Sequence, residues 1–136
     1  MLNFLDTPNF ALMRKELDVL WQRESVITEN IANIDTPNYK AKRLLFETIL
    51  EDKLQNMRKF GNFGKVNKNE VMNVINSAEP KIVTDKRTEA RADGNNVDID
   101  SENVELARVK IQYDYMIRKI TDEYNLLKKA INEGKG

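Results

Sequence analysis

The sequence of 136 residues contains no cysteine and no histidine. These absences exclude thiolate and imidazole nucleophiles, histidine general bases and ordinary zinc sites. The three serines, Ser25, Ser77 and Ser101, have only carboxylates or lysines that could activate them. The composition therefore argues against an enzyme. We expect no catalytic residue, no metal, no cofactor and no small-molecule substrate.

Long apolar runs and an excess of one charge are absent as well. The longest uninterrupted apolar run is Phe10–Met13, which is far too short for a membrane-spanning helix, so we expect no direct membrane insertion. The chain carries 22 basic and 22 acidic residues, mixed along its length, and no basic patch predicts a nucleic-acid partner. Residues 1–6 lack a positively charged stretch followed by an apolar core. No cleaved secretory signal is therefore predicted.

The sequence does contain a long helical pattern near its start. Thr7 is suited to cap this helix and Pro8 to occupy its first position. Apolar residues then recur at alternating steps of four and three over residues 8–34, with Glu24 as one charged interruption. Trp21 lies beside this stripe, and we expect it to pack at the edge of an interface. The stripe is predicted to be an assembly seam and consists of Met13, Leu17, Leu20, Ile27, Ile31 and Ile34.

A stop signal follows this helix. Pro37 has no backbone N–H, and its ring disfavours the helical conformation at Thr36. The helix should therefore end near Ile34 or Asp35. Short polar side chains around the proline favour a turn, and the pattern alone indicates no more than that.

The middle of the chain, residues 40–96, is more polar. It predicts a short amphipathic helix at residues 45–57 and one short strand near residues 81–84. The rest of residues 58–96 is expected to consist of loops, with Gly61–Lys65 as a connector rather than a phosphate-binding loop. A basic cluster follows the turn and is interpreted as a solvated surface: Lys40, Lys42 and Arg43.

An acidic stretch, Asp93–Asp100, precedes the last helical pattern. As a calcium-binding loop with Gly94 at its sixth position, it would need an oxygen ligand at Arg91, and arginine cannot bind a cation. We interpret the stretch as a turn at Gly94, then an extended piece, then a helix capped by Asp100 or Ser101.

The last segment repeats the pattern of the first. A helix is predicted at residues 102–132 and should end at Gly134. Its apolar residues again step by four and three, with Lys110 as the only charged interruption. This second predicted assembly seam consists of Leu106, Tyr113, Ile117, Ile120, Tyr124, Leu127 and Ile131.

These patterns predict a mainly α fold in three parts. Residues 1–39 hold the first long helix and the stop motif, residues 40–96 a loop-rich middle segment with little β structure, and residues 97–136 the second long helix. Each seam is narrow, so each helix is expected to bury one stripe, and the middle is too small and polar for a deep core. We expect the two helices to pair, like a coiled coil, with each other and with neighbouring chains, and the isolated monomer to be partly disordered.

The amino-acid sequence of this stop signal closely resembles the motif that ends the first helix in bacterial flagellar rod and hook axial proteins. Within that group the chain is similar to proximal rod subunits, because a second characteristic stretch precedes the closing helix. The residues that carry the resemblance are Asn30, Ala32, Asn33, Asp35, Thr36, Pro37, Tyr39, Asp93, Gly94, Asn95, Val97 and Asp98.

The resemblance implies a non-enzymatic structural subunit of the basal-body rod, the drive-shaft that crosses the periplasm and transmits torque for motility. It also implies export from the cytoplasm through the flagellar type III apparatus without a cleaved signal. Copies of the same chain, other rod subunits and the protein that joins the rod base to the membrane ring would be its partners. The two long helices would form an inner α-domain around the rod axis, with the middle segment outside.

Two alternatives stay open. The chain could be another subunit of the flagellar rod, since sibling subunits share the first signature. It could also be a helical adaptor or export chaperone that works as a coiled coil, because heptads alone do not separate these classes. The motif that ends the first helix favours a rod subunit, since an adaptor has no need of this motif.

Overall fold

The computed structural model describes residues 7–60, 67–86 and 91–134. The described residues are mainly helical, as predicted, with one small antiparallel sheet of two strands. In chain order the elements are α1 (Pro8–Ala32), β1 (Lys42–Leu45), α2 (Glu47–Phe60), α3 (Lys68–Ser77), β2 (Lys81–Thr84) and α4 (Ile99–Glu133).

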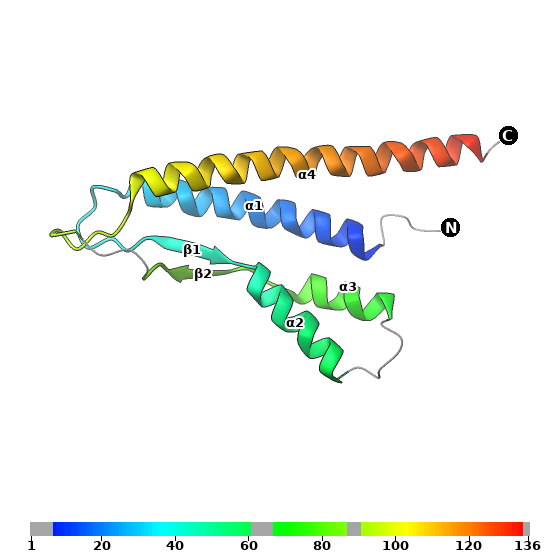
Figure 1. The fold of residues 1–136 in the computed structure, drawn as a ribbon, viewed down its shortest axis with the longest axis horizontal. Helices are drawn as coiled ribbons and strands as arrows, with labels where there is room; N and C mark the ends of the chain where they lie inside the picture. The colour runs from blue at the N-terminus through cyan, green and yellow to red at the C-terminus, as the bar shows by residue number, and fades with distance from the viewer. Residues whose placement is uncertain (1–6, 61–66, 87–90, 135–136) are drawn as a thin grey trace.

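The two long helices lie side by side and run antiparallel, so that the end of α1 meets the start of α4 (Figure 1). Helix α1 has 25 residues and α4 has 35, which correspond to lengths of about 38 and about 52 Å. The last part of α4 therefore extends beyond the start of α1. We call the end where α1 leads into the loop before β1 the junction end, and the opposite end of the pair the free end.

The contact between α1 and α4 uses apolar side chains from both predicted seams. Leu20 and Ile27 of α1 pack with Val109 of α4, and Ile31, Leu106 and Tyr113 border this cluster. The buried apolar residues of α4 are Val109 and Met116, each one residue before Lys110 and Ile117 of the predicted stripe. Leu106 and Tyr113 stay at the contact, so the shift by one residue affects every second position of the predicted seam.

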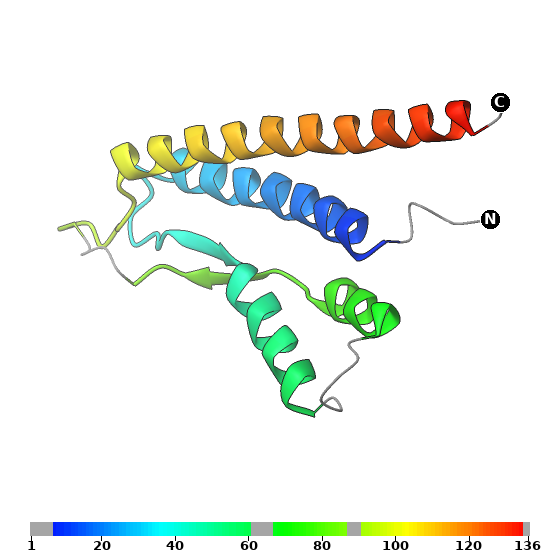
Figure 2. The same ribbon diagram turned by 45° about the vertical axis from the view of Figure 1, so that its right-hand side comes forward.

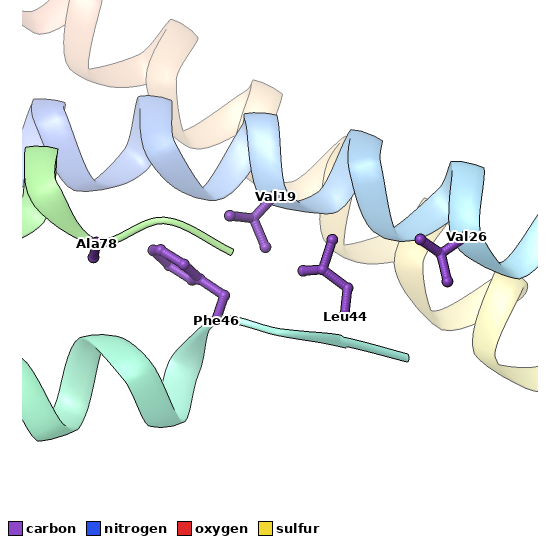
Figure 3. Packing of buried hydrophobic residues seen from close by; sticks show 5 residues of the cluster. All are labelled: Val19, Val26, Leu44, Phe46 and Ala78. Carbon is purple, nitrogen blue, oxygen red and sulfur yellow. The ribbon is translucent and has the colours of Figure 1, made fainter. Parts of the chain in front are cut away.

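Helix α1 also buries a second face, against the middle segment (Figures 2 and 3). Val19 and Val26 point from α1 toward Leu44 of β1, Phe46 at the start of α2, and Ala78 after α3. Phe46 is only 1% exposed. The expectation that each helix buries one stripe is therefore wrong for α1, and the middle segment contributes more to the core than its polar composition indicates.

The sheet forms because β1 and β2 pair antiparallel, with Leu44 opposite Ile82. The predicted strand at 81–84 is confirmed, but its partner at 42–45 was not predicted. The predicted helix at 45–57 is found at 47–60. Helix α3 is absent from the prediction, because three of its ten residues are asparagines, which favour turns, and only Ile75 is buried. The predicted connector Gly61–Lys65 lies outside the described residues.

Candidate assembly site

The two signature stretches, which lie far apart in the sequence, meet at the junction end. The centre of this junction is Asn95, whose side chain is completely buried. Its amide nitrogen donates to the backbone oxygens of Asn33, Ile34 and Thr36 at 2.8, 3.1 and 2.9 Å. Its side-chain oxygen accepts from the backbone N–H of Val97 at 2.8 Å. One asparagine thus holds the turn that follows α1 and orders its own loop; its two N–H groups are shared among the three carbonyl oxygens.

This arrangement explains where the first helix ends. Helix α1 stops at Ala32, two to three residues before the predicted position, and Asn33 caps it. The Asn33 side chain donates to the Glu29 oxygen at 2.8 Å, which satisfies one of the last helical carbonyls. Pro37 lies four residues beyond Asn33 in an exposed turn. Asn33 therefore caps the end of α1, and the bonds from Asn95 hold the turn that follows it, before Pro37 is reached.

Backbone bonds and two unusual conformations hold the loops together. The N–H of Asn38 donates to the Asp93 oxygen at 2.9 Å, and the N–H of Asn96 donates to the Tyr39 oxygen at 3.3 Å. Asn38 and Gly94 adopt left-handed conformations with φ of +59° and +79°. A Cβ added at Gly94 would lie 3.4 Å from the Asn38 Cα and would overlap the Asn38 side-chain oxygen. Glycine is therefore required at residue 94 both by its φ and by the close approach of Asn38.

A second buried polar cluster connects α1, β1 and α4. Asn30, also fully buried, donates to the Lys42 oxygen at 2.9 Å and to Glu102 Oε2 at 3.1 Å, and accepts from the Lys42 N–H at 2.9 Å. Arg43 Nη1 lies 2.5 Å from the buried Glu102 Oε1, and Arg43 Nε lies 3.0 Å from Asp85 Oδ2. Glu102 Oε1 faces Arg43 as an ion pair but accepts no hydrogen bond of good geometry from the described residues. The other bonds of the cluster are directional and connect three elements, which favours one arrangement over others.

This cluster corrects the interpretation of the basic residues at 40–43. Arg43 is not part of a solvated surface, because both of its carboxylate partners are buried. Lys42 Nζ lies 2.5 Å from Glu29 Oε1, and Lys40 bonds to the Gly94 oxygen, so all three basic residues contact protein groups. Tyr39 donates to Asn30 Oδ1 at 3.2 Å, and burial together with the nearby Glu29 raises the pKa of its phenol.

The structure brings most of the predicted motif residues to this junction. The residues that take part in it are Asn30, Asn33, Thr36, Tyr39, Asp93, Gly94, Asn95 and Val97, whereas Ala32, Asp35 and Pro37 are exposed at its surface. Asp98, rather than Asp100 or Ser101, caps α4, with Oδ1 accepting from the Asp100 N–H at 3.1 Å. Sequence reasoning missed the partners Arg43, Asp85, Asn96 and Glu102. Only the doubled asparagine at 95–96 could have drawn attention to one of them.

The predicted assembly seams are divided between buried and exposed positions. From the first seam, Met13, Leu20 and Ile27 are buried, and Leu17, Ile31 and Ile34 are partly buried. From the second, Leu106, Tyr113, Ile120 and Leu127 are partly buried, while Ile117, Tyr124 and Ile131 are exposed. The exposed members are 41, 56 and 52% accessible and are free to contact another chain.

A third apolar stripe runs along α4 and was not predicted. Val104, Ile111, Tyr115 and Leu126 are exposed by 60 to 70%. At about 100° of rotation per residue, they share a face of α4 that is turned by roughly 80–160° from Val109 and Met116. We call these four residues the outer stripe. Helix α4 therefore has apolar side chains on a second face, which α1 does not cover.

A groove of about 210 Å³ lies beside the helix pair, between α1, α4 and the start of α2. Val19, Leu20, Phe46 and Met116 line it with apolar surface, and Glu16, Arg23 and Glu47 place charges at its side. Arg23 Nη2 donates to both carboxylate oxygens of Glu47 at 2.8 Å.

The two carboxylates of the groove differ in their environment. Burial, together with the neighbouring charge of Glu47, raises the pKa of Glu16. Burial alone would raise the pKa of Glu47 too, but its bonds with Arg23 and with backbone N–H groups together outweigh this, and the pKa is lowered. Lys119 and Arg23 act in the opposite direction on the pKa of Glu16 but do not outweigh burial and Glu47.

Nothing in the described residues suggests catalysis or metal binding. In residues 7–60, 67–86 and 91–134, no group of three or more acidic residues is placed to hold a metal ion. None of the described helices has the length and apolarity that a membrane span requires. The site that the structure does present is an ordered polar junction together with exposed apolar faces of α4.

Comparison with known proteins gives a consistent result. The family described as "Flagella basal body rod protein" matches residues 22–40, which form the end of α1 and the loop held by Asn95. The chain is 35% identical over 113 residues to the flagellar basal body rod protein FlgB of Bacillus subtilis, covering 83% of this chain and 84% of that protein. The chain belongs to the FlgB family of flagellar basal body rod proteins.

Two further relatives support the same family. FlgB of Borreliella burgdorferi is 40% identical over 105 residues, covering 74% of this chain and 78% of the relative. FlgB of Escherichia coli is 25% identical over 138 residues, covering 98% of this chain and 99% of the relative. The likeness to FlgB thus includes both long helices and the middle segment, well beyond the short signature.

Proposed function

We propose that the chain is a structural subunit of the flagellar basal-body rod, in its proximal part, and that it assembles through its two terminal helices. The observation that carries this proposal is the exposed apolar surface of α4. Ile117, Tyr124 and Ile131 are left uncovered by α1, on a helix that extends about 15 Å beyond α1. Exposed apolar surface of this extent is typical of a protein that is covered by partners in its working state.

The polar junction supports the same function for a different reason. A subunit that repeats in a rod must hold its parts at one angle in every copy. Asn95 and the Glu102–Arg43–Asp85 cluster connect α1, the β1–β2 sheet and α4 through directional bonds. Directional, buried polar bonds specify one arrangement more narrowly than apolar packing does. We infer that the junction sets the angle at which the middle segment leaves the helix pair.

The partners and the location follow from this role. Association with other flagellar basal-body components is the common property of the family. More specifically, we propose contacts with copies of this chain, with other rod subunits and with the protein that joins the rod base to the membrane ring. We also propose that the chain is exported through the type III apparatus without a cleaved signal and reaches the periplasmic rod, where it transmits torque for motility.

Replacing Ile117 by aspartate tests the assembly role. Ile117 is 41% exposed, so the change should leave the thermal stability of the isolated chain nearly unchanged. In the rod, the same carboxylate would be buried without a partner, at a cost of several kcal/mol. We expect the variant to be absent from isolated basal bodies and cells carrying only this variant to be non-motile.

The matched control is Asn125→Asp, which places the same side chain at an exposed polar position of the same helix. It should assemble normally. Ile27 of the first seam is not suited to this test, because it is 3% exposed and a carboxylate there would destabilise the isolated chain itself. Normal motility and a normal amount of Ile117→Asp protein in basal bodies would contradict the proposed interface.

A further inference from the structure

The junction contains the only Asp–Gly pair of the sequence, Asp93–Gly94. An Asp–Gly bond is chemically labile in a flexible chain, because glycine has no Cβ to shield its backbone nitrogen from the aspartate side chain. The nitrogen of Gly94 can attack Cγ of Asp93, and this attack begins a rearrangement of the main chain. The sequence contains no Asn–Gly pair, which would react in a similar way. Asp93 is therefore the residue at which this chain is most open to such a rearrangement.

The rearrangement needs no oxidant and no reactant other than water. A bond forms between the Gly94 nitrogen and Cγ of the protonated Asp93 carboxyl group. The hydroxyl of that group leaves as water and takes the amide hydrogen with it, so that a five-membered succinimide forms. Water then attacks the former main-chain carbonyl of Asp93, and the bond from that carbon to the nitrogen breaks. The product is isoaspartate, which has the same mass as aspartate.

The closed junction holds the attacking nitrogen. The Gly94 N–H donates to the Arg91 oxygen at 2.8 Å, and the Arg91 N–H donates to the Asn95 oxygen at 2.7 Å, so these residues form a tight turn. The attack requires the nitrogen to give up its hydrogen and to turn toward Cγ of Asp93. The bond to Arg91 retains this hydrogen, and the φ of +79° at Gly94 belongs to the same turn. The nitrogen is therefore withdrawn from the reaction while the turn is intact.

The carboxylate of Asp93 is held as well. Its Oδ1 accepts from the Asn95 N–H at 3.1 Å, and its Oδ2 lies 3.2 Å from Arg91 Nη2. These bonds, first with Arg91 and then with the Asn95 N–H, lower the pKa of Asp93. An ionised carboxylate resists the attack, because its oxygen leaves as water only after protonation. The fold thus restrains both groups that the reaction needs.

Isoaspartate at residue 93 would be incompatible with the closed junction. The main chain would pass through Cβ and Cγ of this residue, which adds one atom to the backbone before Gly94. The former carbonyl oxygen, which accepts from the Asn38 N–H at 2.9 Å, would become part of a free carboxylate. Asn95 would be displaced from the three carbonyl oxygens that it binds.

We propose that Asp93–Gly94 is a site of spontaneous isoaspartate formation, that the closed junction suppresses the reaction, and that a chain modified there can no longer close the junction. The product carries a free α-carboxylate, which makes it a substrate for the class of methyltransferases that act on isoaspartate. A chain that stays unfolded ages at this bond, whereas a folded chain keeps it intact. The hydrogen bonds that order the junction thus preserve the main chain on which they depend.

Long incubation of the full-length chain at neutral pH, folded in buffer or unfolded in guanidinium chloride, tests the site. Trypsin releases residues 92–108 as one peptide, which also contains Asp100–Ser101. Electron-transfer fragmentation locates isoaspartate, and methyltransferase labelling measures its amount. We expect accumulation mainly at residue 93 in the unfolded chain, and accumulation about tenfold slower in the folded chain, where the junction must first open. Equal rates in both samples, or no isoaspartate in the unfolded chain, would overturn the proposal.

Two variants separate the two restraints. Asp93→Asn reacts by loss of ammonia without prior protonation of a carboxylate, so it reports the hold on the Gly94 nitrogen alone. We expect the folded variant to deamidate much more slowly than the unfolded variant. Arg91→Gln should speed the reaction of the folded chain severalfold, whereas Arg108→Gln, which removes an exposed arginine elsewhere, should not. Deamidation of Asp93→Asn at the same rate folded and unfolded would overturn the first restraint, and an unchanged rate in Arg91→Gln the second.

Refolding of the modified chain tests the effect on the junction. Chains with isoaspartate at residue 93 are separated by ion-exchange chromatography from unmodified chains of the same incubation, which serve as the matched control. Both are returned to buffer, and their thermal unfolding is compared. We expect the modified chain to melt at a lower temperature and to lose slow amide exchange at Asn95 and Asn96. The same melting temperature and the same exchange in both chains would overturn the claim that the junction requires an unmodified Asp93.

Discussion

The two ends of the α1–α4 pair are built in opposite ways. At the junction end the polar groups are buried and bonded, with Asn30, Asn95 and Glu102 all completely inaccessible. At the free end the polar groups are in solvent, and apolar side chains such as Tyr124, Leu126 and Ile131 are exposed by more than half. Buried polar groups and exposed apolar groups both raise the free energy of an isolated chain, unless bonding partners or covering contacts compensate for them.

At the junction end the compensation comes from the chain itself. Asn95 alone bonds to three carbonyl oxygens of the turn after α1, and Arg43 forms ion pairs with both Glu102 and Asp85. At the free end no described element covers the apolar side chains of α4. The difference teaches that the junction end determines the shape of the subunit, whereas the free end depends on other chains. Substitutions at the two ends should therefore have separable effects.

The largest effect is expected from Ile27→Ala. Ile27 is 3% exposed and packs with Leu20 and Val109, so the cavity should lower the free energy of unfolding by about 2–5 kcal/mol. Ile131→Ala makes the same chemical change at the free end, where the side chain is 52% exposed. It should alter the free energy of unfolding by no more than about 0.5 kcal/mol. Urea unfolding of both variants measures the difference. Equal effects would remove the distinction between the two ends.

The next effect is expected from Asn95→Asp, which keeps the shape of the side chain. Aspartate has no N–H to donate, and its charge would face the oxygens of Asn33, Ile34 and Thr36. The free energy of unfolding should fall by about 3 kcal/mol, since each unsatisfied buried group costs roughly 1–3. Asn103→Asp, exposed on α4, is the control and should be nearly neutral. A neutral Asn95→Asp would mean that the loops meet without needing this residue.

Gly94→Ala should have a smaller effect on the same junction. The left-handed conformation costs an alanine about 1–2 kcal/mol, and the added Cβ overlaps the Asn38 side chain. Asn38→Gly removes that overlap, so the double variant should recover part of the loss, and a double-mutant cycle measures this part. Strictly additive changes would show that only the φ of residue 94, and not the contact with Asn38, requires glycine.

The sequence predicted the free end better than the junction end, for a physical reason. Periodicity reports which residues share a helix face, so the long helices, their caps at Thr7 and Gly134 and the strand at 81–84 could be predicted. It does not report which residues meet across the fold. The one-residue shift to Val109 and Met116 in the α4 contact is set by packing with α1.

From the sequence, the junction could be recognised only as a pair of family motifs, without the contacts between them. Asn95 and Asn33 are separated by more than 60 positions, and Arg43 finds Glu102 and Asp85 only once the chain is folded. Helix α3 was missed because its stability comes from tertiary contacts of Ile75 and Ala78, which its polar sequence does not indicate. The partial disorder expected for the isolated monomer stays a prediction.

The smallest effect concerns Glu16 in the groove, between the two ends. Its raised pKa, caused by burial and then by Glu47, means that the folded chain holds the proton more tightly than the unfolded chain. The stability that the bound proton provides is fully present below the pKa of Glu16 in the unfolded chain, 4.5, and is lost as the pH rises through its pKa in the folded chain. Glu16→Gln should therefore raise the melting temperature at pH 7, and the difference from the original chain should vanish on acidification below pH 4.5.

Glu47→Gln sharpens this result because the sign is reversed. The pKa of Glu47 is lowered, since its bonds with Arg23 and with backbone N–H groups together outweigh the effect of burial. The stability that the Glu47 carboxylate provides is therefore present above its pKa in the unfolded chain, 4.5, and is lost as the pH falls through its pKa in the folded chain. Thermal melts between pH 3 and 8 should show Glu47→Gln less stable and Glu16→Gln more stable than the original chain at neutral pH. If Glu16→Gln were destabilising at pH 7, the attraction of Lys119 and Arg23 for the Glu16 carboxylate would outweigh its burial, and the raised pKa of Glu16 would be wrong.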